Sequence, residues 1–308
     1  MPKAAGDMTV MTELSDPAVD QTYRPRFRKL LVRLLKSKTG LVGLVIVVSV
    51  SLLAIFAPLI APHDPAKTGV VNRLLPPFWL DDGDLDYLLG TDNLGRDVLS
   101  RLIYGSRISL LVGISSVVLA GIIGMFLGLV AGFYGKFWDF IIMRTVDSFL
   151  AIPGILFMLI LLAVLGPSVI TLILVLGGTS WVVYARMVRG ETLSVKERDY
   201  VRSAQAIGAK NFRIITKYIL PNVMSSFIVI ATLSVATTII LEASLSFLGL
   251  GIQSPDVSWG LMLSDGRQYI ATSWWVATFP GVAITITVLG VIFLGDWLRD
   301  ILDPKIKD

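Results

Sequence analysis

Few side chains in this 308-residue chain are of types and spacings that carry out catalysis. There is no cysteine, which excludes disulfides, thiolate metal sites and cysteine nucleophiles, and the single histidine, His63, excludes a histidine cluster. A phosphate-binding loop needs G-x-x-x-x-G-K-[ST], but the only Gly-Lys pair, Gly135-Lys136, lacks the earlier glycine and is followed by Phe137. No nucleophile elbow, H-E-x-x-H zinc motif or paired carboxylates occur in a suitable context. We expect no catalytic residue, metal site or cofactor, so energy for any work must come from a partner subunit or an ion gradient.

Charged residues are rare inside the apolar segments. Glu242 is the one carboxylate in the run 223–245, and a carboxylate there costs a few kcal/mol and faces a partner group or a watery cavity. Two interpretations stay open for Glu242, a structural hydrogen bond or a place on a solute path. Arg144 and Asp147 are one helical turn apart, and we expect them to pair with each other near the cytoplasmic boundary rather than bind a solute.

Residues 201–221 form a polar, basic island between long apolar segments. Val201, Ala204, Ile207 and Gly208 are spaced to form an apolar stripe on one helix face. Lys210, Arg213 and Lys217 are spaced to form a second, basic stripe. The pattern predicts two short helices hinged near Gly208, with Pro221 in the first turn of the next helix. Such a bend is either a docking surface or a solvated loop whose basic residues only mark the cytoplasmic side.

The elements around these residues must be membrane helices. The chain is 54% hydrophobic and 16% charged, with a mean hydropathy of +0.75, which is too apolar for an ordinary soluble domain. The formal charge of +4 and pI near 9.3 do not indicate nucleic acid, because the basic residues lie beside the apolar segments. About 20 apolar residues cross the roughly 30 Å of bilayer hydrocarbon. Six segments qualify: 41–60, 108–133, 140–165, 169–187, 223–245 and 276–297.

The loop charges predict one orientation. Segments 24–38 and 186–217 are rich in basic residues, whereas 61–107 carries an excess of acidic ones. We therefore predict an all-α membrane protein with six transmembrane helices and both termini in the cytoplasm. Pro153 should kink the third helix. The first long apolar run begins only at Leu41, which indicates no cleaved signal peptide.

This topology divides the chain into consecutive regions. Residues 1–40 form a cytoplasmic tail whose basic amphipathic segment lies on membrane lipid. The helix 41–60 and an extracytoplasmic loop 61–107 follow. A five-helix core spans 108–297 and includes a cytoplasmic loop at 188–222. Residues 298–308 form a cytoplasmic tail.

Small and aromatic residues suggest further contacts. Ala120, Gly124, Gly128 and Gly132 recur every four residues, so one helix face allows close approach, either in ordinary bundle packing or against a moving neighbour or partner subunit. Four outer-loop tryptophans fit an aromatic belt at the headgroups or, alternatively, a platform for an extracellular binding protein: Trp79, Trp259, Trp274 and Trp275. We predict that His63 is a turn residue.

The spacing of Ala204, Gly208 and the run 219–221 resembles the cytoplasmic loop of ATP-binding-cassette importer permeases, whose pattern contains Glu-Ala-Ala, Gly and Ile-x-Leu-Pro. This chain departs from it, because Arg202-Ser203-Ala204 replaces Glu-Ala-Ala and Ile-Leu-Pro closes up the last element. In that family the loop carries a coupling helix that docks into a separate ATPase. The resemblance implies ATPase-coupling roles for Arg202, Ser203, Ala204, Ile207, Gly208, Ala209 and Pro221.

Further motifs resemble the C-type permease subunit of bacterial dipeptide and oligopeptide importers. They are LGTDNLGRDVLSR at 89–101, YGSRISL at 104–110, MRTVD at 143–147, LSFLGLG at 245–251, WGLM at 259–262 and GDWLRDILDP at 295–304. The resemblance implies a type I importer permease fold in the bacterial inner membrane. The implied partners are a B-type permease paralogue, two ATPase subunits that bind ATP and Mg²⁺, and an extracytoplasmic substrate-binding protein.

Two alternatives remain. The same architecture could import nickel, glutathione or another small solute, because related importers share these motifs. A self-contained secondary transporter is disfavoured, since such proteins usually carry several intramembrane charges or broken helices in matching halves, whereas Glu242 is nearly alone.

Overall fold

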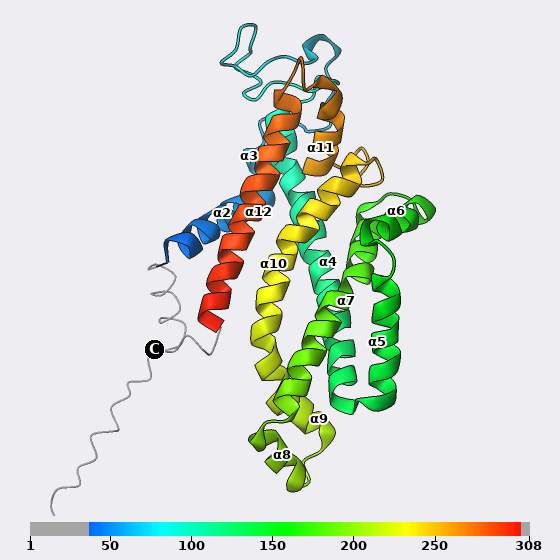
Figure 1. Cartoon of the computed structure of the whole chain (residues 1–308). Helices are drawn as coiled ribbons and strands as arrows, with labels where there is room; N and C mark the ends of the chain where they lie inside the picture. Colours follow the sequence, from blue (N-terminus) through cyan, green and yellow to red (C-terminus); the bar gives the residue numbers. More distant parts are fainter. Residues whose placement is uncertain (1–36, 303–308) are drawn as a thin grey trace, which may run out of the picture.

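The computed structural model describes residues 37–302, and these residues form helices and loops without a β-strand (Figure 1). Residues 24–36 of the expected basic segment 24–38 and both chain ends, 1–23 and 303–308, lie outside the described residues. Five helical stretches are long and apolar enough to cross a membrane. They are α2 (Lys38–Ile55), α4 (Val98–Tyr134), α7 (Val169–Lys196), the stretch Asn211–Phe247 that ends in α10 (Leu220–Phe247), and α12 (Trp275–Leu302).

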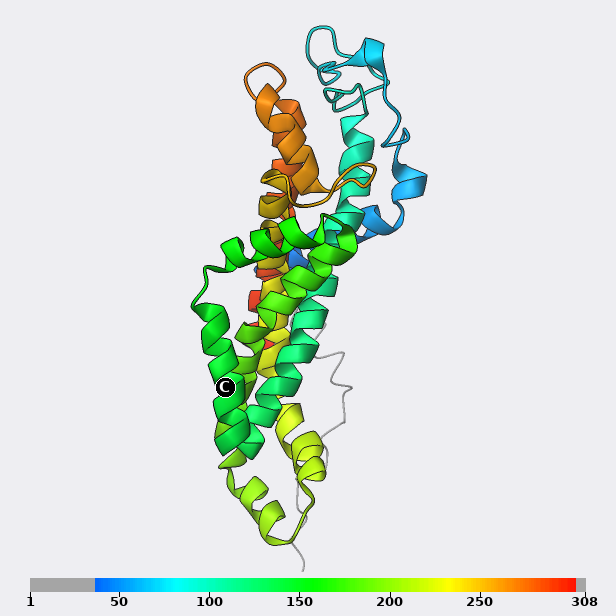
Figure 2. The ribbon, with the colours of Figure 1, turned by 90° about the vertical axis from the view of Figure 1, so that its right-hand side faces the viewer.

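The long helices form a bundle with distinct ends (Figures 1 and 2). One end carries the short helices α8 (Asp199–Ala206) and α9 (Asn211–Ile214). The other end, called here the α11 end, carries α3 (Ala57–Ile60), the loop 61–97 and α11 (Trp259–Gly266). At about 1.5 Å per residue, α4 is roughly 55 Å long and extends beyond a bilayer core. It begins at Val98, before the predicted boundary at 108, because Asp97 caps it by accepting from the amides of Leu99 and Ser100.

The third predicted span is broken rather than kinked. It consists of α5 (Lys136–Leu150) and α6 (Gly154–Leu165), which meet at 86°. Pro153 lies at the N-cap of α6, where its missing amide N–H is tolerated but the preceding helix cannot continue. Figure 2 shows α6 running across the bundle instead of extending α5. The predicted single helix 140–165 is therefore wrong in shape, and the bent pair makes a sixth span only if its two parts are counted together.

The second short helix expected after Gly208 is not separate from the fifth span. α9 continues through a π-helical turn, Ile215–Ile219, directly into α10. The π turn lies where the ring of Pro221 would meet the carbonyl of the preceding turn, so the wider turn accommodates the proline. Asn211–Phe247 thus forms one continuous helical stretch.

The glycine stripe of α4 packs against α7 of the same chain. A Cβ atom added at Gly124 would lie 2.4 Å from Tyr184 Cβ, and one at Gly128 would lie 2.7 Å from Val188 Cβ. At Gly132 the added atom would lie 2.7 Å from Thr192 Cβ. The stripe therefore serves packing within the bundle, and α7 occupies the face that a partner subunit would need.

Candidate functional site

The α8–α9 end is a helical hairpin closed by Gly208. Gly208 has φ +82°, in the left-handed region that favours glycine, and its position has open space around it. Val201 and Ala204 of α8 are buried, in the case of Val201 against a cluster that includes Ile214 and Val223. This part of the predicted apolar stripe faces the core of its own chain.

The exposed part of the hairpin differs from the predicted stripe. Ile207 is 85% exposed and Phe212 is 78% exposed, one on each side of Gly208. Ser203 and Pro221 are also exposed, whereas Ala209 is half-buried. Ile207 and Phe212 are thus two large apolar side chains on an otherwise polar, exposed hairpin. Phe212 had not been singled out from the sequence, although it lies four residues after Gly208.

Arg202, which stands where the family pattern has glutamate, pairs within its own chain. Its guanidinium donates to the Glu197 carboxylate, which raises the pKa of Arg202 above its usual value. Both side chains are exposed, so the pair contributes little to stability.

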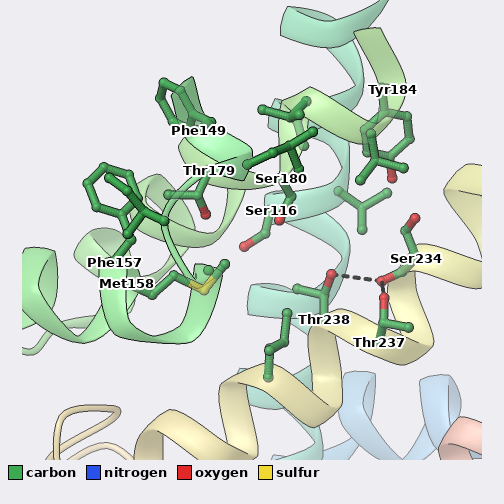
Figure 3. Close-up of a pocket in the computed structure, with 18 of the residues that line it drawn as sticks. Ser116, Phe149, Phe157, Met158, Thr179, Ser180, Tyr184, Ser234, Thr237 and Thr238 are labelled. Atoms are coloured by element: carbon green, nitrogen blue, oxygen red, sulfur yellow. Dashed lines mark hydrogen bonds between the residues drawn. The ribbon is translucent and has the colours of Figure 1, made fainter. Parts of the chain in front are cut away.

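A cavity of about 410 Å³ opens beside the break between α5 and α6. Its walls come from α4, the α5–α6 junction, α7 and α10 (Figure 3). Seven of its lining residues carry hydroxyl groups: Ser116, Thr179, Ser180, Tyr184, Ser234, Thr237 and Thr238. Sequence reasoning missed this site, although serines and threonines recurring inside apolar helices were a usable signal.

Glu242 lies outside that cavity lining, with 0% exposure. Its carboxylate accepts hydrogen bonds from Ser258 at 2.8 Å, Ser246 at 2.9 Å and Ser109 at 3.3 Å. The three hydroxyls come from α10, α4 and the N-cap of α11, so the carboxylate joins three elements. This geometry favours the structural interpretation of Glu242 over a place on a solute path.

Arg144 and Asp147 of α5 lie 3.9 Å apart, Nη1 to Oδ2, which agrees with their expected pairing. Their side chains are nevertheless 68% and 61% exposed. Arg144 also lies over the ring of Phe140, 5.3 Å from its centroid. This side of α5 therefore presents charges and aromatic surface outward from the bundle.

Four charged side chains form an ion cluster at the α11 end. Asp92 pairs with Arg96 at 2.7 Å and with Arg101 at 3.3 Å, and both arginines also reach Asp265, at 3.1 Å and 3.2 Å. Burial raises the pKa of the Asp265 carboxyl, while the two guanidiniums act in the opposite direction. The cluster fastens the loop 61–97 to α11.

Two expectations about the α11 end are wrong. His63 is more than a turn residue, because its Nδ1 lies 3.4 Å from Asp97 Oδ2 and its ring stacks on Tyr87. Trp259 and Trp275 do not belong to a surface belt, since both are buried and donate to the carbonyls of Leu102 and Thr91. Trp79 and Trp274 are the exposed pair.

Comparison with known proteins identifies the family. Residues 124–308 match the model for the binding-protein-dependent transport system inner membrane component, and residues 26–77 match the N-terminal transmembrane domain of oligopeptide transport permease C. This chain belongs to that family of transport permeases. The permease is 42% identical over 294 residues to the di/tripeptide transport system permease protein DppC of Pseudomonas aeruginosa, covering 96% of each chain. It is 41% identical over 277 residues to the oligopeptide transport system permease protein OppC of Bacillus subtilis, covering 90% of this chain and 89% of that one.

A solved structure shares the fold of the permease. A chain of the inward-facing MetNI methionine ABC transporter aligns with a TM-score of 0.54 and 21% identity, covering 66% of this chain and 96% of that chain. The permease is a type I importer permease in fold, and it is a transport subunit rather than an enzyme. Among residues 37–302 no cluster of three or more metal-ligating side chains occurs.

Proposed function

We propose that this permease is half of the membrane channel of an ATP-driven importer for dipeptides or oligopeptides in a bacterial inner membrane. A B-type permease paralogue supplies the other half, two separate subunits bind ATP and Mg²⁺, and an extracytoplasmic substrate-binding protein delivers the peptide. The relatives in Pseudomonas aeruginosa and Bacillus subtilis are named as di/tripeptide and oligopeptide transport permeases, which supports the peptide cargo.

The observation that carries the proposal is the exposed pair Ile207 and Phe212 beside Gly208. An ATPase groove that receives the hairpin buries both side chains, and Gly208 leaves no side chain between them. This assignment places the α8–α9 end in the cytoplasm, together with the end of α12 at Leu302, which points toward the same side (Figure 1). Loop 188–222 is then the coupling loop.

Movement of the hairpin reaches the membrane through α10. Because α9, the π turn and α10 form one continuous helical stretch, a displacement at Phe212 is carried rigidly toward the cavity residues Ser234, Thr237 and Thr238. Closure of the ATPases on ATP would thus shift one wall of the cavity, which is the rigid-element coupling that alternating access requires.

The outward charges of α5 support a second permease subunit. Charged side chains at membrane depth face protein or water rather than lipid, because transfer into hydrocarbon is costly. Arg144 and Asp147 are exposed in this chain, which fits a neighbouring subunit or the channel between the two subunits at this face of α5. At the α11 end, exposed Trp79 and Trp274 offer contact surface to the substrate-binding protein.

Reconstitution of the complex tests the proposal. The permease is co-expressed with the second permease and both ATPase subunits, placed in proteoliposomes, and supplied with the binding protein. We expect uptake of peptide that requires ATP and the binding protein. Uptake of nickel or glutathione in place of peptide would overturn the cargo, and peptide uptake by the permease alone, driven by an ion gradient, would overturn the ATP-coupled mechanism.

A further inference from the structure

The cavity beside the α5–α6 break is lined without ionisable acids or bases. Among the described residues, its wall contains no aspartate, glutamate, lysine, arginine or histidine. The rest of the lining is apolar and includes Phe149, Phe157 and Met158 (Figure 3). Its volume of about 410 Å³ lies within the range of about 300–1,000 Å³ typical of ligand pockets.

Several hydroxyls in the wall are positioned to accept hydrogen bonds from a solute. Thr179 donates to the carbonyl of Val175 at 2.7 Å, and Thr237 and Thr238 donate to the carbonyl of Ser234 at 3.0 Å and 2.7 Å. A hydroxyl that has donated its proton to its own helix keeps oxygen lone pairs. These threonines therefore present acceptors, and peptide N–H groups are matching donors.

A serine hydroxyl in the wall is available to donate. Ser116 Oγ on α4 is buried and has no hydrogen-bond partner among the described residues, whereas Tyr184 OH on α7 lies beside the Ser234 side chain and can pair with it. Buried polar groups are normally satisfied, so an unpaired hydroxyl in a cavity wall indicates a missing partner. A χ1 rotation redirects a serine hydroxyl, and a solute carbonyl is the partner that would accept from it.

Uncharged hydrogen-bond donors and acceptors, together with aromatic and methionine surface, match one chemical class of solute. We propose that this cavity is a transit subsite for the peptide main chain, whose amide and carbonyl groups the hydroxyls recognise while the apolar wall accepts varied side chains. Methionine and aromatic walls adapt to different shapes. An uncharged wall binds no side-chain charge tightly, which suits a site that a solute must enter and leave. This inference rests on the proposed function and specifies its substrate contacts.

The test uses the reconstituted complex with wild-type chain, Thr179→Val, Thr237→Val and the double variant. Valine keeps the shape of threonine and removes the hydroxyl. The matched control is Thr285→Val, because Thr285 on α12 donates in the same way to the carbonyl of Gly281, at 2.8 Å, but does not line the cavity. Uptake at saturating binding protein is measured for tripeptides with neutral, acidic and basic side chains.

We expect each cavity variant to change uptake roughly threefold to tenfold, the size expected for one hydrogen bond. The change should be equal for the three peptide classes, with Thr285→Val unchanged. Wild-type uptake of peptide with no effect of the cavity variants overturns the subsite and leaves the proposed function standing. A change confined to acidic or basic peptides also overturns it, and a wild-type complex that takes up no peptide overturns both.

A second measurement does not depend on variant folding. A tripeptide carrying a photoreactive benzophenone side chain is supplied to the wild-type complex during turnover and irradiated. Benzophenone inserts readily into methionine C–H bonds, so we expect a label at Met158 in the cavity wall. Labelling of the complex elsewhere but not on the α5–α6 junction, α7 or α10 would overturn the assignment.

Discussion

Arg101 of α4 and Asp265 of α11 form an ion pair, with 3.2 Å between Nη2 and Oδ2, across 164 residues of chain. The Arg101 side chain is only 2% exposed and also pairs with Asp92 in the outer loop. One buried guanidinium thus holds together a long helix, a loop and a short helix at the α11 end.

Replacing Arg101 by methionine should destabilise the α11 end. The change leaves the Asp92 and Asp265 carboxylates close together with only Arg96 between them, and removing one partner from a buried pair costs about 3–5 kcal/mol. The midpoint of thermal unfolding of the purified chain in detergent should fall by several degrees. Arg107→Met is the control, because Arg107 is exposed and has no ion pair among the described residues. Equal midpoints for the two variants would contradict a role for the cluster in stability.

Substitution of Glu242 separates its two interpretations. Glutamine keeps an oxygen that accepts from Ser246 and Ser258, so Glu242→Gln should cost less than about 1 kcal/mol. Leucine leaves buried hydroxyls without an acceptor, each costing about 1–3 kcal/mol, so Glu242→Leu should lower both yield and thermal stability. Peptide uptake should follow stability in both variants. Loss of uptake by Glu242→Gln at unchanged thermal stability would show instead that the carboxylate acts on the solute path.

A glycine pair on the packed helices tests the α4–α7 contact. At Gly128 a Cβ would lie 2.7 Å from both Val188 Cβ and the Ala185 carbonyl oxygen, so Gly128→Ala should cost about 1–3 kcal/mol through overpacking. At Gly190 on α7 there is open space, and Gly190→Ala should stabilise the helix by up to about 1 kcal/mol. Thermal unfolding should therefore shift in opposite directions. Unchanged or raised stability of Gly128→Ala would show that α4 and α7 separate at no cost.

The sequence predicted the membrane-spanning helices well wherever a long apolar run marked them. The glycine stripe at 124–132 and the hairpin at Gly208 were recognisable because each depends on local spacing. The boundaries were less accurate, since helices such as α4 continue beyond the bilayer, where hydropathy gives no signal. Pro153 signalled an interruption, but nothing in its neighbourhood specified an 86° turn.

Contacts between residues that are far apart in the sequence could not be predicted. Glu242 meets Ser109 across 133 residues, and Arg101 meets Asp265 across 164, distances that no spacing rule covers. The predicted apolar stripe is helical at Val201 and Ala204, but α8 ends at Ala206, so Ile207 lies at the C-cap. Only packing shows that Val201 is buried and Ile207 exposed. A short amphipathic helix has two candidate partners, its own bundle and another subunit, and its periodicity is the same for both.

The charge pair on α5 gives a prediction about assembly. Replacing Arg144 and Asp147 together by leucine removes both charges from this face. If lipid covers the face, the variant should assemble as well as wild type or better. Because we propose that a second permease or the channel covers it, we expect the double variant to insert normally but to recover less of the partner permease on co-purification. Undiminished recovery together with normal peptide uptake would contradict that placement.

The coupling role of the hairpin is tested by two glycines with the same backbone. Gly208 has φ +82° and Gly249 has φ +84°, and each lies in open space within the chain, but Gly249 follows α10 at the opposite end from the hairpin. Leucine at either position strains the backbone by about 1–2 kcal/mol. Only Gly208→Leu adds bulk between Ile207 and Phe212, where the ATPase is proposed to dock. We expect Gly208→Leu to insert into the membrane normally. Its rates of peptide uptake and of ATP hydrolysis stimulated by the binding protein should each fall at least about tenfold, whereas Gly249→Leu should keep coupled hydrolysis. Equal losses in both variants would indicate backbone strain alone, and full coupled uptake by Gly208→Leu would refute docking at this bend.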